Sequence, residues 1–95
     1  MIKHIVMWRI NEPVRENALR IKQGLEGLNG KIPGLLRLEV GIDFSREGES
    51  ADVVLYSEFE NRLALDAYQS HPAHGEVVPL VKAVRSERRV ADYEV

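Results

Sequence analysis

The first strand-like segment of the chain is apolar on both of its faces. Residues 2–10, IKHIVMWRI, are rich in β-branched and aromatic side chains, which predicts a β-strand. Side chains alternate between the two faces of a strand. One face carries Ile2, Val6, Trp8 and Ile10, and the other carries Ile5 and Met7. A sheet that contains this strand therefore has to be covered on both sides.

The next segments predict a helix and a two-stranded hairpin. Apolar residues recur at spacings of four and three between residues 14 and 28, which predicts an amphipathic helix that ends near Asn29 and Gly30. The apolar residues that alternate with polar ones in the following strand are Leu36, Leu38, Val40, Ile42 and Phe44. A polar loop at residues 45–51 then leads into a strand over residues 52–59.

The C-terminal third predicts a helical region and a last strand. Asn61 is placed to cap a helix that ends at His71, because the residue before a proline avoids the α conformation. The segment that follows has a helical period, although Pro79 is expected to kink or restart it. Residues 88–95 are expected to form the closing strand.

The order of these elements, β-α-β-β-α-β, predicts an α+β ferredoxin-like fold, a four-stranded antiparallel sheet with its helices on one face. A chain of 95 residues has room for one hydrophobic core, so residues 1–95 are expected to form a single domain. The helices cover one face only, and the other face of the first strand is apolar. The simplest cover is a second copy of the chain, which predicts a homodimer.

Composition and charge exclude several classes of protein. With a formal net charge of −2 and a pI near 5.9, the chain lacks the positive electrostatic potential that attracts phosphates, so nucleic acid is not an expected partner. The chain has no cysteine, which excludes disulfides and thiolate chemistry. The apolar run at the N-terminus is short and interrupted by His4 and Arg9, so no signal or membrane segment is expected. We expect a cytoplasmic protein.

The candidates for chemistry are concentrated in residues 68–74, YQSHPAH. If His71 caps a helix that starts at Pro72, then His74 is the third residue of that helix, beside its positive end. This position disfavours the imidazolium ion and keeps the ring neutral, as a general base requires. Tyr68 can donate a hydrogen bond to a developing enolate oxygen. His4 can orient the other groups or relay a proton.

Each of these residues also has a structural interpretation. His71 serves either as a cap or as a ligand contact, and Tyr68 either as a core aromatic residue or as a donor. Trp8 either packs in the core or provides a surface on which a ligand stacks. His4 is either a buried, hydrogen-bonded histidine or a functional one. The three histidines do not predict a zinc site, because a proline separates His71 from His74, and no cofactor fingerprint occurs.

Four segments together resemble the stress-responsive A/B barrel (Dabb) family of the dimeric α+β barrel superfamily: KHIVMWRI, IPGLLRLEVGIDF, YSEFENRLALDAYQSHPAH and VADYEV. The most specific parts are the Lys3-His4 pair and the His-Pro-x-His segment at 71–74. The resemblance implies a homodimer whose two sheets pack into a barrel. One plant branch of the family resembles a catalyst of aldol ring closure on linear polyketides, and its site residues match His4, Tyr68 and His74.

Two functions follow from the residues and the resemblance. The first is a cofactor-free lyase or cyclase that acts on a small, partly apolar, polyketide-like carbonyl compound. The second is a non-catalytic, stress-responsive dimer that binds or interacts with another molecule and whose histidines serve the fold. The first predicts a pocket at His4, Tyr68 and His74. The second predicts no pocket, or one that is filled by side chains.

Overall fold

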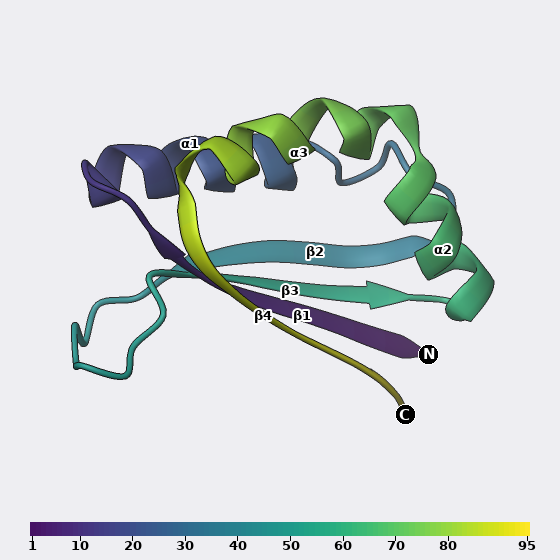
Figure 1. Cartoon of the computed structure of the whole chain (residues 1–95). Coiled ribbons are helices and arrows are strands. Elements are labelled where there is room, and N and C mark those ends of the chain that lie inside the picture. The colour runs from purple at the N-terminus through teal and green to yellow at the C-terminus, as the bar shows by residue number, and fades with distance from the viewer.

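The computed structural model describes residues 1–95 and places three helices in one layer above a four-stranded antiparallel sheet (Figure 1). The elements are β1 (Ile2–Ile10), α1 (Val14–Glu26), β2 (Leu35–Ile42), β3 (Val53–Phe59), α2 (Arg62–Ser70), α3 (Pro72–Val84) and β4 (Arg85–Glu94). This confirms the predicted ferredoxin-like α+β order, with the second helical region divided into α2 and α3 at Pro72. None of the helices has the length and apolar character needed to cross a membrane.

The sheet has the strand order β2-β3-β1-β4, so β1 is central and β4 lies at an edge. In this register His4 lies opposite Ser57 on β3 and opposite Asp92 on β4. Four residues further along β1, Trp8 lies opposite Arg88 on β4. The pairing of β1 with β4 therefore joins residues from the two ends of the chain, and the N- and C-termini lie near each other in Figure 1.

The core lies between the sheet and the helices. Seventeen buried apolar residues form one cluster, to which every element except β4 contributes. The helix-facing side of β1 is buried, whereas Met7 on the opposite side is 47% exposed. The alternation that the sequence predicts for β1 is therefore confirmed, and the sheet face away from the helices is open in the single chain.

Three predicted details are wrong. The second strand contains a bulge between Leu35 and Arg37, which shifts the alternation so that Leu36 is 53% exposed. Phe44 lies beyond the end of β2 and is 95% exposed, because the strand ends at Ile42. Pro79 lies inside α3, so the helix does not restart there.

Element boundaries also differ from the sequence-based ranges. The first helix ends at Glu26, and the turn that follows still buries Leu28. The last strand begins at Arg85 rather than at residue 88, directly after α3. Without a loop between α3 and β4, the end of the helix is held at the edge of the sheet.

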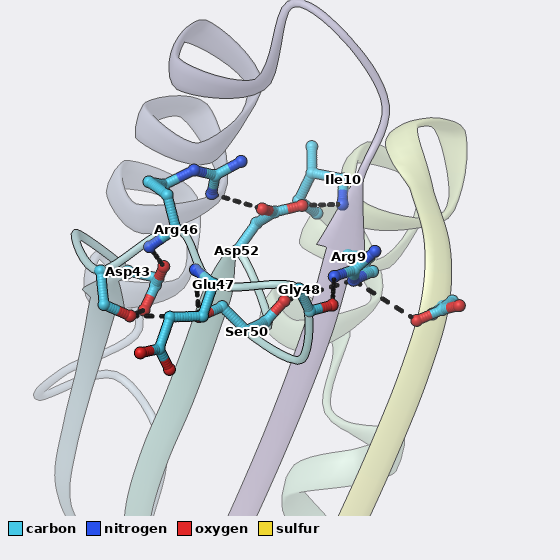
Figure 2. A network of polar contacts seen from close by, with 10 residues as sticks. Arg9, Ile10, Asp43, Arg46, Glu47, Gly48, Ser50 and Asp52 are labelled. Carbon is cyan, nitrogen blue, oxygen red and sulfur yellow. Dashed lines mark hydrogen bonds and ion pairs between the residues drawn. The ribbon is translucent and has the colours of Figure 1, made fainter.

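The hairpin loop between β2 and β3 is fixed to the end of β1 by a polar network (Figure 2). The buried carboxylate of Asp52 accepts a hydrogen bond from the backbone N–H of Ile10 at 2.8 Å and one from the Arg46 guanidinium at 2.5 Å. Arg9 donates to the backbone oxygens of Gly48 and Ser50. These contacts hold the end of β1 that follows Trp8.

Candidate active site

A cavity of about 330 Å³ lies between the inner face of the sheet and α3. Its lining combines apolar side chains with a tyrosine, two histidines and three cationic residues. The lining residues are His4, Val6, Trp8, Leu25, Leu55, Tyr68, His74, Val77, Val78, Val81, Lys82, Arg85 and Arg88. The structure thus brings together the three residues predicted to carry chemistry, from β1, α2 and α3.

Tyr68 is at the centre of this group. Its ring centroid lies 4.4 Å from that of His74, 4.9 Å from that of Phe59 and 6.2 Å from that of His4. The side chain is 1% exposed, and burial raises the pKa of its hydroxyl to about 12. Tyr68 therefore keeps its proton at neutral pH and can act as a hydrogen-bond donor.

His74 occupies the third position of α3, as the sequence predicts. His71 caps the helix, because its Nδ1 accepts a hydrogen bond from the backbone N–H of Ala73 at 3.0 Å, and Pro72 takes the first position. Burial lowers the pKa of His74, the backbone carbonyl of Gln69 acts in the opposite direction, and repulsion between the two rings when both His4 and His74 are protonated lowers it further. The direction agrees with the sequence-based expectation, but the main cause is burial.

His4 is buried on β1, where Nδ1 of its ring contacts the carboxylate of Asp92 on β4. An Nδ1–H that donates to a carboxylate fixes the orientation of the ring and leaves the second nitrogen free to act as an acceptor when the ring is neutral. His4 also lines the cavity, so Asp92 positions a ring that faces the interior. The sequence-based prediction did not include Asp92, because its position opposite His4 depends on the strand register.

The two residues predicted to contact a ligand differ in their positions. Trp8 lines the cavity and is buried, so it is both a core residue and a residue of the site. His71 does not line the cavity, and its ring serves as the cap of α3. Three cationic residues of the lining, Lys82, Arg85 and Arg88, were not predicted.

Three buried polar atoms have no hydrogen-bond partner in the chain: Trp8 Nε1, the Tyr68 hydroxyl and His74 Nδ1. All three belong to residues that line the same cavity. Buried polar groups in folded proteins are nearly always paired, and an unpaired one is costly. Their concentration marks this cavity as the part of the core where buried polar groups lack partners within the chain. No group of three or more His, Asp or Glu side chains is arranged to hold a metal ion.

Titration of His74 provides a direct test of its environment. Its imidazole resonances should titrate with a midpoint below the ordinary value of 6.5, because burial disfavours the charged ring. The unfolded chain then binds a proton that the folded chain does not, so this group destabilises the fold as the pH falls from above 6.5 toward the lowered pKa. The measurement is an NMR titration, with His74→Gln to assign the signal. A midpoint at or above 6.5 would contradict the buried, neutral ring.

Comparison with known proteins agrees with this architecture. An uncharacterised protein of Streptomyces coelicolor is 31% identical over 97 residues, which cover 99% of each chain. A dimeric, ferredoxin-like protein of unknown function from Bacteroides fragilis is 28% identical, with a TM-score of 0.89 over 99% of this chain and 95% of the other. A hydroxynitrile lyase from Passiflora edulis is 15% identical, with a TM-score of 0.84 over 99% and 92%, and shares the fold alone.

The family comparison covers almost the entire chain. The model of the stress responsive A/B barrel domain matches residues 2–95. The match includes all four strands and all three helices, and therefore every residue that lines the cavity. The chain belongs to the stress-responsive A/B barrel (Dabb) family.

Proposed function

We propose that the chain is a cofactor-free lyase or cyclase that closes a ring by aldol addition within a small, partly apolar, polyketide-like carbonyl compound. His74 is the base, Tyr68 is the hydrogen-bond donor, and His4 is a positioning residue held by Asp92. The observation that carries the proposal is the meeting of two unpaired polar groups, the Tyr68 hydroxyl and His74 Nδ1, in a cavity with apolar walls.

The reaction needs one proton acceptor and one donor. His74 takes a proton from a carbon next to a carbonyl group, and the electron pair moves to the carbonyl oxygen to form an enolate. Tyr68 donates a hydrogen bond to that oxygen as its charge develops. The enolate carbon then attacks a second carbonyl carbon of the same molecule, forming a carbon–carbon bond. The oxygen of the second carbonyl receives the proton from His74, which restores the neutral base.

The state of both residues at neutral pH supports these roles. The pKa of Tyr68 is raised, so the hydroxyl keeps the proton that it has to donate. The pKa of His74 is lowered, so the ring is neutral but weakly basic. A weak base requires an acidic carbon, such as the one between two carbonyl groups. This favours a β-dicarbonyl compound over a simple ketone.

We further propose that residues 1–95 act as one domain and form a homodimer through the open face of the sheet. Met7 and Tyr93 on this face are both nearly half exposed, and Ile5, Val54, Tyr56 and Ala91 continue the apolar surface around them. The Bacteroides fragilis protein of the same fold is dimeric. Light scattering should give the mass of two chains, and a monomer at all concentrations would contradict the dimer.

The alternative function is a non-catalytic dimer that binds a ligand in the same cavity. The cavity and its unpaired groups suit a bound molecule whether or not it reacts. The two functions differ in turnover and not in binding, so one experiment separates them.

The test offers the protein a linear compound with several alternating carbonyl groups and follows the absorbance of the cyclised product. We expect multiple turnovers per chain. Tyr68→Phe removes the donor and should reduce kcat by about 10²-fold, in the range found for the loss of one oxyanion donor. Because Phe keeps the ring in the core, the fold should be retained. Saturable binding without cyclisation above the rate in buffer would support the non-catalytic dimer instead.

A further inference from the structure

We infer that the molecule bound in the cavity carries an anionic group, a carboxylate or a phosphate, which is held by Lys82, Arg85 and Arg88 at the end of the cavity away from His74. This rests on the proposed function and specifies its substrate class: an elongated carbonyl compound with a negatively charged terminus. The inference concerns recognition and adds no chemical step.

The first argument is the absence of counter-ions for these three cations. Lys82, Arg85 and Arg88 all line the cavity, and none forms an ion pair within the chain. The neighbouring acid Glu87 lies 3.7 Å from Arg9, measured between Oε2 and Nε. No Asp or Glu lines the cavity, so its charge is entirely positive apart from the histidines. A cleft lined by one sign of charge concentrates ligands of the opposite sign.

The second argument is independent of charge. Trp8 lines the cavity, and its buried indole Nε1–H has no acceptor in the chain. Trp8 lies opposite Arg88 in the pairing of β1 with β4, so the two side chains belong to adjacent positions on one sheet face. An indole N–H, a guanidinium and an ammonium group are donors only. Lys82 and Arg88 are exposed and Arg85 is half-buried, so a group rich in acceptors, such as a carboxylate or a phosphate, can reach and complement these donors.

The third argument is the course of α3 beside β1. At one end, the rings of His74 and His4 both lie close to the ring of Tyr68, at 4.4 and 6.2 Å between centroids. At the other end, the backbone N–H of Asn11 donates to the carbonyl of Val84 at 2.7 Å. The helix and the strand therefore run side by side in the same direction, and the cavity extends along both.

The distance between the two ends follows from this alignment. His4 and Trp8 are four residues apart on β1, which corresponds to about 13 Å at the rise of a β-strand. His74 and Lys82 are eight residues apart on α3, which corresponds to about 12 Å at the helical rise. A bound molecule that reaches both ends is thus extended, with its reactive carbonyl groups at the histidines and its anion at the cations. The intervening walls are valine and leucine side chains.

Three probes of equal length measure how much the anionic group contributes to the binding affinity. They are a linear β-diketone, the same β-diketone ending in a carboxylate, and the same β-diketone ending in a phosphate monoester. Trp8 is the only tryptophan of the chain, so its indole N–H resonance and its fluorescence report binding at one position. We expect the charged probes to bind at least about tenfold more tightly than the neutral one, and the advantage to shrink with added salt. The tighter of the two charged probes identifies the group.

The decisive variant is Arg85→Gln combined with Arg88→Gln, in which the charged and neutral probes should bind with nearly equal affinity. The matched control is Arg15→Gln combined with Arg20→Gln, which changes the net charge equally at two exposed arginines of α1 that form no ion pair. The control should keep the preference for charged probes. Lys82→Gln alone should reduce the preference in part and provides a second variant at the same end of the cavity.

The outcomes for the inference and for the proposed function are separate. Equal affinity of the wild-type protein for all three probes overturns the inference, even if ring closure is observed. If the double variant of Arg85 and Arg88 still binds the charged probes more tightly than the neutral one, the anionic group is not held by these arginines. If the double variant loses the preference for charged probes, the inference is supported. If in addition no form of the protein closes the ring, the proposed function is contradicted while the inference stands. No binding by any probe overturns both.

Discussion

Replacing His74 by alanine is expected to slow ring closure by a factor of about 10²–10⁴, the usual contribution of a general base. The effect should appear in kcat, because the base acts in the chemical step and the cavity walls that bind the substrate remain. The ring that lies nearest to Tyr68 is then absent, and His4, whose centroid is 6.2 Å from that of Tyr68 and whose Nδ1 contacts Asp92, is farther from the reacting carbon. The measurement is the rate of product formation at saturating substrate, compared with the wild-type protein.

The matched control for this variant is His71→Asn. Asparagine is a good N-cap, so it replaces the acceptor that His71 provides to the backbone of Ala73 while removing an imidazole three residues from His74. We expect its activity and melting temperature to remain close to those of the wild-type protein. Equal losses of activity in the two variants would mean that the start of α3, and not the base, limits the rate, and would contradict the proposed role of His74.

Replacing Gly34 by alanine is expected to lower the free energy of unfolding by about 2–5 kcal/mol. Gly34 has a φ of +82°, a conformation that disfavours a side chain, and a Cβ atom at this position would lie 2.5 Å from the Cβ of Ala64 on α2. Both the strain and the collision add to the cost. Since α2 carries Tyr68, displacement of the helix should also widen the separation between the Tyr68 and His74 rings. Chemical denaturation measures the loss.

Gly30→Ala is the matched control, because Gly30 has a nearly identical φ of +80° but no atom within 4 Å of the place that a Cβ would occupy. Its cost should be limited to about 1–2 kcal/mol of backbone strain. In the double variant Gly34→Ala/Ala64→Gly, removal of the second methyl group should recover part of the loss beyond the ordinary cost of a helical glycine. Equal costs at Gly34 and Gly30 would show that α2 does not approach the chain closely at this turn.

Most of the fold could be predicted because its signals are local. The period of apolar residues distinguishes strands from helices, and Asn61 caps α2 as expected through its side-chain oxygen and the N–H of Ala64. The errors arise where a contact between residues far apart in the sequence determines the local structure. The bulge at Leu35–Arg37 is set by pairing with β3, so the exposed side of Leu36 could not be inferred from alternation.

The candidate site was predictable in part for the same reason. The position of His74 at the start of α3 follows from the neighbouring His71 and Pro72, and the structure has the same arrangement. Asp92 and the three cations were missed, because nothing in the sequence near them indicates a cavity. They could have been found only by combining the topology with the register of β4, in which Asp92 and Arg88 lie on the face that bears His4 and Trp8.

The amino-acid sequence by itself determined the order of the elements, the buried faces of β1 and α1 and, through the resemblance of four segments, the family. The order and the buried faces depend on periodicity and capping, which act over a few residues. Only the tertiary structure decided that His4 meets Asp92 from 88 residues away, that Tyr68 and His74, each with an unpaired polar atom, lie together, and that three cations line the same cavity. Those features depend on strand register and helix packing, which are set by the fold of the whole chain.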